Sequence, residues 1–189
     1  LIGWPERGRK WGDFGAGMRI GFVCEWDIDE KRARAHNRRL GKGVTKADVK
    51  IPAQAVEFGG HHYFLFNRTV TWHMAMQACE NLGGHLVRIE TPDENQFVKQ
   101  LAKQGSRSET CWIDGSDEAK EGVWRFSDGR RMVYTSWLGG EPSNVGTGEH
   151  HLGLTKNADW NWNDANSSAR GAFICEWDRS SIWRDGSTV

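Results

Sequence analysis

The sequence predicts an α+β fold, because two helix patterns are followed by short strand patterns that long polar loops separate. The helix patterns cover residues 71–84 and 91–104, and strand patterns at residues 61–70 and 85–89 precede them. Eleven tryptophans and eight phenylalanines supply a dense aromatic core for such a domain. The later strand patterns cover residues 111–117, 122–132, 134–137, 151–155, 160–164 and 172–177.

Each helix pattern has a recognisable start. Thr71 opens the first helix, two consecutive glycines mark its end, and its apolar residues recur at helical spacing. These residues, which place the cysteine among them on the inward face, are Trp72, Ala75, Met76, Cys79 and Leu82. Thr91 is the expected N-cap of the second helix, with Pro92 in the first turn and Glu94 as its partner in a capping box.

Charge and hydropathy argue against several classes of function. The chain of 189 residues has 25 basic and 25 acidic side chains, so no overall field attracts nucleic acid or an anionic membrane surface. No apolar stretch approaches the roughly 18 residues that span a bilayer, so no membrane insertion is expected. No nucleophile, base and orienting group stand together, so we do not expect an enzyme. The chain begins with Leu1 and shows no signal peptide, which favours a mature or excised fragment.

The chain contains a partial internal repeat. Residues 162–178 read WNDANSSARGAFICEWD, and residues 11–27 read WGDFGAGMRIGFVCEWD, with Trp, Asp, Arg, Phe and Cys-Glu-Trp-Asp aligned without a gap. Residues 1–27 are therefore predicted to be the C-terminal remnant of an upstream copy of the same domain. Residues 28–57 have the composition of a basic linker, residues 58–178 form the domain, and residues 179–189 form a tail.

Four blocks of sequence in this order resemble the C-type lectin-like domain over residues 58–178. They read YFLF…TWHMAMQACENLGGHLVRIETPDENQFV, WIDGSD, W…GEPSN…GE and WND…FICEW. The resemblance implies a double-loop fold, with two helices flanking antiparallel sheets and a long ligand-binding loop. It implies a calcium-dependent carbohydrate-binding module of a larger extracellular repeat protein, with a glycan or glycoprotein as partner.

The four cysteines are read through the same resemblance. None of Cys24, Cys79, Cys111 and Cys175 forms a CxxC pair, so we do not expect a four-thiolate zinc site. We expect disulfides in an exported domain instead. The resemblance implies a disulfide between Cys79 and Cys175. Cys111 is either a buried thiol or a partner of Cys24, which is otherwise free.

The family's second, short-range disulfide is missing from this sequence. Its two positions correspond to His151 and to the neighbourhood of Ser167 and Ser168, and none of these is a cysteine. The long loop therefore lacks a covalent link, and we expect calcium to order it.

The resemblance also implies a calcium (Ca²⁺) site that binds the sugar. Calcium prefers oxygen ligands from carboxylates, amide carbonyls and water. Ser143 stands where the motif has asparagine, and this replacement weakens the site unless Asn144 takes the place of Ser143. The peptide bond before Pro142 is expected to be cis. The implied metal ligands are Glu141, Ser143, Asn144, Glu149, Asn163 and Asp164, and all of these except Asn144 are also expected to contact the sugar.

A second, auxiliary calcium site is expected to be weak or empty. Its carboxylates correspond to Asp117, Glu121, Glu149, Asn144 and His150, so two acidic ligands are replaced by an amide and an imidazole. The alternative is that Asp117 and Glu121 belong to a solvated turn.

Zinc is a minor alternative at the sequence level. Glu149, His150 and His151 are adjacent, but neighbouring histidines on a strand point to opposite faces and cannot share one ion. His61 and His62 have the same spacing.

Glu141 favours sugars with equatorial 3- and 4-hydroxyls, namely mannose, glucose and N-acetylglucosamine, because the resemblance links a leading glutamate to that preference. Trp160 is either a stacking face for a sugar ring or a core residue, and Trp162 is expected in the core. Asn67 and Asn166 lie in glycosylation sequons. The alternative function is a calcium-independent protein-binding or adhesion domain that keeps the fold with a degenerate sugar site.

Overall fold

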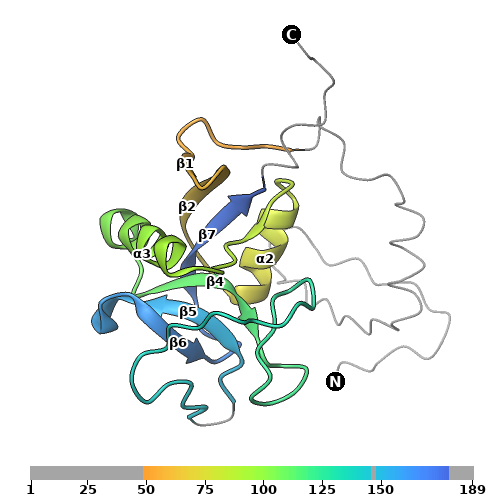
Figure 1. The fold of residues 1–189 in the computed structure, drawn as a ribbon, viewed down its shortest axis with the longest axis vertical. Coiled ribbons are helices and arrows are strands. Elements are labelled where there is room, and N and C mark those ends of the chain that lie inside the picture. The colour runs from red at the N-terminus through yellow and green to blue at the C-terminus, as the bar shows by residue number, and fades with distance from the viewer. Residues whose placement is uncertain (1–48, 146–147, 179–189) are drawn as a thin grey trace, which may run out of the picture. The chain divides into compact units, whose positions relative to one another are not determined.

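The computed structural model of the protein describes residues 49–145 and 148–178 (Figure 1). Within them one seven-stranded sheet runs in the order β1-β2-β7-β4-β5-β6, and β3 pairs with β7. The helices are α2 (Trp72–Glu80), α3 (Pro92–Gly105) and the short 3₁₀ helix η2 (Lys156–Ala158). The strands are β1 (Val56–Phe58), β2 (His61–Val70), β3 (His85–Leu86), β4 (Thr110–Ser116), β5 (His151–Thr155), β6 (Asn161–Ala165) and β7 (Gly171–Trp177).

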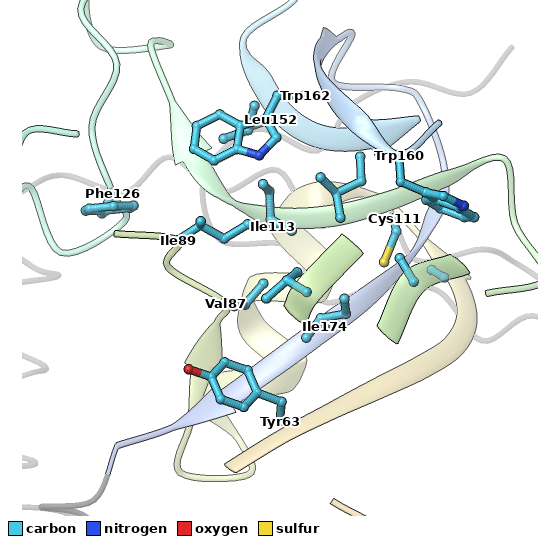
Figure 2. Packing of buried hydrophobic residues seen from close by; sticks show 14 of the residues in the cluster. Tyr63, Val87, Ile89, Cys111, Ile113, Phe126, Leu152, Trp160, Trp162 and Ile174 are labelled. Carbon is cyan, nitrogen blue, oxygen red and sulfur yellow. The ribbon is translucent and has the colours of Figure 1, made fainter. Parts of the chain in front are cut away.

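Strand β7 pairs with β2, β3 and β4 in the interior of the sheet, and all its residues are buried. Successive side chains of a strand point to opposite faces of the sheet. Ala172 and Ile174 join a core cluster that includes residues of α3, shown in Figure 2, whereas Phe173 and Cys175 join a second cluster that includes residues of α2. Each helix therefore packs through a different face of the same strand, which confirms the α+β class.

Local sequence determines where both helices begin. The Thr71 hydroxyl accepts the N–H of Met74 at 3.4 Å, and the Thr91 hydroxyl accepts the N–H of Glu94 at 3.2 Å. The predicted capping box is only half formed, because the Glu94 carboxylate accepts the N–H of Glu90 at 2.8 Å instead of the N–H of Thr91. The other Glu94 oxygen accepts the Tyr63 hydroxyl at 2.8 Å, so this carboxylate joins a local contact to a tertiary one.

The sheet is mixed, which corrects the prediction of antiparallel sheets. Strands β4 and β7 run parallel, with Cys111 opposite Ala172 and Trp112 opposite Phe173. No hairpin joins these two strands, because β5, β6 and their loops lie between them in sequence, and a long connection permits parallel pairing. The strand predicted at residues 122–132 is also wrong, since this segment makes only isolated bridges, through Arg125.

The domain begins earlier than residue 58. Val56 pairs with Tyr63 in the β1–β2 ladder, and the Lys50 N–H donates to the Leu82 carbonyl at 2.8 Å. Val49 and Ile51 pack against the α2 cluster, so the last part of the predicted linker belongs to the domain. The remnant at 1–27, the linker up to residue 48 and the tail at 179–189 lie outside the described residues. Among the described helices, none has the length and apolarity that crossing a bilayer requires.

Cys79 and Cys175 are buried neighbours that are unbonded in the structure. Their side chains contact each other, and burial followed by the proximity of Cys79 raises the pKa of the Cys175 thiol. The disulfide between them stays a prediction. Cys111 is a fully buried thiol, which agrees with its interpretation as a buried thiol in the sequence analysis. Burial also raises the pKa of Cys111. Cys24 lies outside the described residues.

We predict that the oxidised protein contains a Cys79–Cys175 disulfide. Closing so long a loop contributes roughly 4–5 kcal/mol in the chain-entropy model, so reductant should lower the urea midpoint of unfolding. Non-reducing peptide mapping identifies the bond directly. The double variant Cys79→Ala, Cys175→Ala is the control, whose midpoint should not respond to reductant. Alkylation of both cysteines in denatured protein that has never been reduced would contradict the prediction.

Candidate functional site

The buried carboxylate of Asp164 connects the predicted calcium loop to strand β6. Its Oδ1 accepts the N–H of Ser143 at 3.1 Å, and its Oδ2 accepts the N–H of Asn144 at 2.8 Å. The Asp164 side chain is fully buried, and charged hydrogen bonds are the strong ones in such a setting. This carboxylate therefore fixes the backbone of two other predicted ligands.

Glu149 closes the same loop from its other end. Its Oε2 accepts the N–H of Val145 at 2.9 Å and lies 3.5 Å from the Ser143 hydroxyl oxygen. The N–H of Glu149 donates to the Asn144 side-chain oxygen at 2.9 Å. Asn144 has a φ of 48°, a left-handed conformation that asparagine tolerates better than most residues. The second glutamate of the motif thus lies beside Ser143.

Glu141 carries an unpaired oxygen. Its Oε2 is buried and has no hydrogen-bond partner among the described residues, and the Glu141–Pro142 peptide is cis, which confirms the expectation for Pro142. Burying a carboxylate oxygen without a partner is costly. This oxygen therefore has an unused capacity to bind a cation or a hydroxyl donor.

Asn163 and Asp164 supply the last two predicted ligands. The Asn163 side-chain amide lies against the main-chain carbonyl of Asp164 and donates to it. The amide oxygen and nitrogen exchange places by rotation about χ2, so the same position can present an oxygen. The whole set consists of carboxylate, amide, hydroxyl and carbonyl oxygens, which fits calcium and does not fit a soft metal.

The predicted auxiliary ligands Asp117, Glu121 and His150 also come together. Asp117 Oδ1 is 3.0 Å from His150 Nδ1, and Glu121 Oε2 is 3.6 Å from the same nitrogen. Asp117 Oδ2 accepts the N–H of Gly122 at 2.8 Å. Asp117 is only 2% exposed, so the interpretation as a solvated turn is wrong for it and holds only for exposed Glu121. An imidazole faces both carboxylates, which is consistent with weak calcium binding there.

The two consecutive histidines face different surroundings, as the strand argument predicts. His150 faces Asp117, whereas His151 is fully buried and packs against the rings of Trp72 and His73, with centroid distances of 5.0 and 4.7 Å. Burial lowers the pKa of His151 to about 4, so its imidazole is neutral at pH 7.

The sequence does not predict the neighbours of His151. His73 on α2 and Glu118 after β4 lie beside it, and the three side chains bring their ligand atoms within 4.8 Å of one another. No spacing pattern signals this cluster, because only the packing of α2 on the sheet brings distant segments together.

Both tryptophans of the β6 region belong to the core. Trp160 is 4% exposed, so it offers no open face for a sugar ring, which leaves the core interpretation. Trp162 is fully buried, as predicted, and its indole N–H donates to Asn95 Oδ1 at 2.8 Å. β6 is therefore held in the core by Trp162 directly beside the candidate ligands.

The two-helix fold on a mixed sheet, with an oxygen-rich loop after a cis proline, defines the class of C-type lectin domains. The family model described as the lectin C-type domain matches residues 68–177, more than half of the chain, so the protein belongs to the C-type lectin family. The chain is 31% identical over 138 residues to lithostathine-2 of Mus musculus. The aligned region covers 71% of this chain and 79% of lithostathine-2.

Two solved structures extend the comparison. The carbohydrate-recognition domain of the mouse scavenger receptor C-type lectin is 31% identical, with a TM-score of 0.62, and covers 68% of this chain and 98% of its own. A type II antifreeze protein described as calcium-independent is 26% identical, with a TM-score of 0.60, and covers 68% of this chain and 94% of its own. The fold is therefore similar both to a carbohydrate-recognition domain and to a protein described as calcium-independent.

We predict that Asp164→Ala releases the loop from β6. Two backbone N–H groups lose a charged acceptor, so the free energy of unfolding should fall by about 2–4 kcal/mol. The amides of Ser143 and Asn144 should exchange with solvent faster, which NMR measures. Asp159→Asn is the control, because Asp159 is an exposed residue at the C-cap position of η2, where an asparagine is tolerated. Unchanged protection at Ser143 and Asn144 would contradict the assigned role.

Proposed function

We propose that this domain is a calcium-dependent carbohydrate-binding module. The observation that carries the proposal is the buried, unpaired Glu141 Oε2 among a set of oxygen ligands on the 141–149 loop and β6. A divalent cation would give this oxygen a partner, which none of the described residues does. The family relationship supports carbohydrate as the ligand class.

The residues that would hold calcium divide into two groups. Asp164 and Glu149 are fixed by hydrogen bonds to loop N–H groups, so their positions are set before an ion binds. Glu141, Ser143 and Asn163 contribute the remaining side-chain oxygens, with Asn144 oriented by Glu149. Calcium would offer coordination to the hydroxyls of a sugar, and the same carboxylates would accept hydrogen bonds from those hydroxyls while the amide of Asn163 would donate one.

The sugar preference and setting belong to the same proposal. Glu141 supports the mannose, glucose and N-acetylglucosamine class. Ser143 has a shorter side chain than the asparagine of the motif and lacks its amide donor, so both affinity and selectivity are reduced. We place the domain in an extracellular protein whose partner is a glycan or glycoprotein.

The second candidate is a calcium-independent protein-binding or adhesion domain. The observation in its favour is that protein groups already satisfy the Asn144 side-chain oxygen and one oxygen of Glu149. The similar antifreeze protein, described as calcium-independent, supports the same alternative. The two candidates differ in what calcium does to stability and to sugar binding.

We predict that calcium raises the melting temperature and that a chelator reverses the rise. Extracellular calcium modules bind at about 10⁻⁴–10⁻³ M, so titration to about 10 mM should stabilise the fold by roughly 1.5–3 kcal/mol. Glu141→Gln should remove the response, whereas Glu57→Gln, at an exposed position in β1, should retain it. Calorimetry with mannose should show heat only in the presence of calcium. A calcium-insensitive melt together with the absence of sugar heat would favour the second candidate.

We predict that Ser143→Asn tightens calcium binding about tenfold, because an amide oxygen reaches further and is a stronger dipole than a hydroxyl. Isothermal titration with calcium measures the gain, and mannose titration at saturating calcium tests whether the added amide donor also strengthens sugar binding. Ser167→Asn, at an exposed neighbouring turn, is the matched control. Equal dissociation constants for Ser143→Asn and the wild type would show that Asn144 already fills the position.

A further inference from the structure

Three metal-ligating side chains meet on the side of the sheet that α2 covers. His73 comes from α2, Glu118 follows β4, and His151 opens β5. Their ligand atoms lie within 4.8 Å of one another, although the residues are far apart in sequence. The calcium loop does not contribute to this cluster.

His151 is the unusual member of the cluster. It is fully buried, and neither ring nitrogen has a hydrogen-bond partner among the described residues. Its Nε2 faces Glu118 Oε2 at 3.7 Å, which is too long for a hydrogen bond. A buried imidazole with both nitrogens unpaired costs free energy, and a bound ion at Nε2 would recover part of it.

We propose that His73, Glu118 and His151 form a zinc site. Two imidazoles and one carboxylate are a ligand set that zinc takes in proteins, with a fourth position open to water. Imidazole nitrogen is a poor ligand for calcium, so this cluster and the oxygen-lined loop select different ions.

The distances fit a tetrahedral ion after small side-chain movements. Ligand atoms around zinc lie about 3.3 Å apart when the bonds are about 2.0 Å long. His73 Nε2 and Glu118 Oε2 are already 3.2 Å apart. His73 and Glu118 are about half exposed, with side-chain accessibilities of 48% and 53%, so an ion can enter from solvent and both side chains can turn toward His151.

A bound zinc would connect α2, the end of β4 and the start of β5. His151 follows Glu149 by two residues, so the ion would fasten the base of the long loop. The sequence resemblance places one cysteine of the missing short-range disulfide at this same position. Zinc coordination would connect this position to α2 and to the end of β4, and not to the region of Ser167 and Ser168 that the disulfide would have joined. The proposal does not depend on sugar or calcium binding.

The test is zinc titration of the whole chain without calcium, followed by calorimetry and thermal melting. We expect one zinc ion to bind and to raise the melting temperature. Cobalt(II) should give visible absorption bands of four-coordinate intensity. His73→Gln and Glu118→Gln remove exposed ligands, so both variants should fold, and each should weaken zinc binding more than about 100-fold, beyond the usual effect of an outer-shell change.

Matched variants separate this site from its neighbours. His61→Gln alters another partly buried histidine beside carboxylates and should leave zinc binding unchanged, and so should Glu141→Gln in the calcium loop. Retention of zinc binding in both His73→Gln and Glu118→Gln would overturn the proposal. Loss of zinc binding in Glu121→Gln alone would also overturn it, because the ion would then belong to the His150 cluster. A melting temperature of the wild type that does not change with zinc would overturn it as well.

Discussion

The buried carboxylate of Asp164 is the interaction on which the candidate site depends. A buried charge is tolerated only when donors surround it, and the N–H groups of Ser143 and Asn144 provide two of them. Strand β6 holds this carboxylate in place because Trp162, two residues earlier on the same buried face, is locked to Asn95. The core thus determines the position of the loop through a single side chain.

The alternation of side chains along a strand sorts the ligands of this domain into separate chemistries. In β6, the buried side chains of Trp162 and Asp164 alternate with the half-buried side chain of Asn163. At the entrance to β5, His150 faces the Asp117 carboxylate, whereas His151 enters the apolar space beside Trp72. The candidate ligands of the loop and β6 are therefore a set of oxygen atoms, whereas His150 and His151 each belong to a cluster that combines imidazole with carboxylate.

Local features of the fold could be read from the sequence, and features made by tertiary contact could not. The helix starts at Thr71 and Thr91 depend on caps within three residues, so they are predicted correctly. One of the two partners of the Glu94 carboxylate is the hydroxyl of Tyr63, which is distant in sequence and which no local pattern contains. The parallel β4–β7 pair and the meeting of His73 with His151 likewise arise only once the sheet is assembled. The candidate ligands Glu141, Ser143 and Glu149 are close in sequence, so their proximity could be predicted, whereas their role as ligands stays a prediction.

The hydrogen bonds of the loop bear on how calcium would act. The missing short-range disulfide suggests that calcium orders the loop, yet Asp164 and Glu149 already hold its described residues through backbone N–H groups. Each carboxylate oxygen has a second lone pair, so these contacts leave capacity for an ion. A loop ordered by its own contacts loses little conformational entropy on binding, which favours affinity. The difference between a calcium-dependent and a calcium-independent domain then depends less on ordering the loop than on two side chains, the unpaired carboxylate of Glu141 and the short hydroxyl of Ser143.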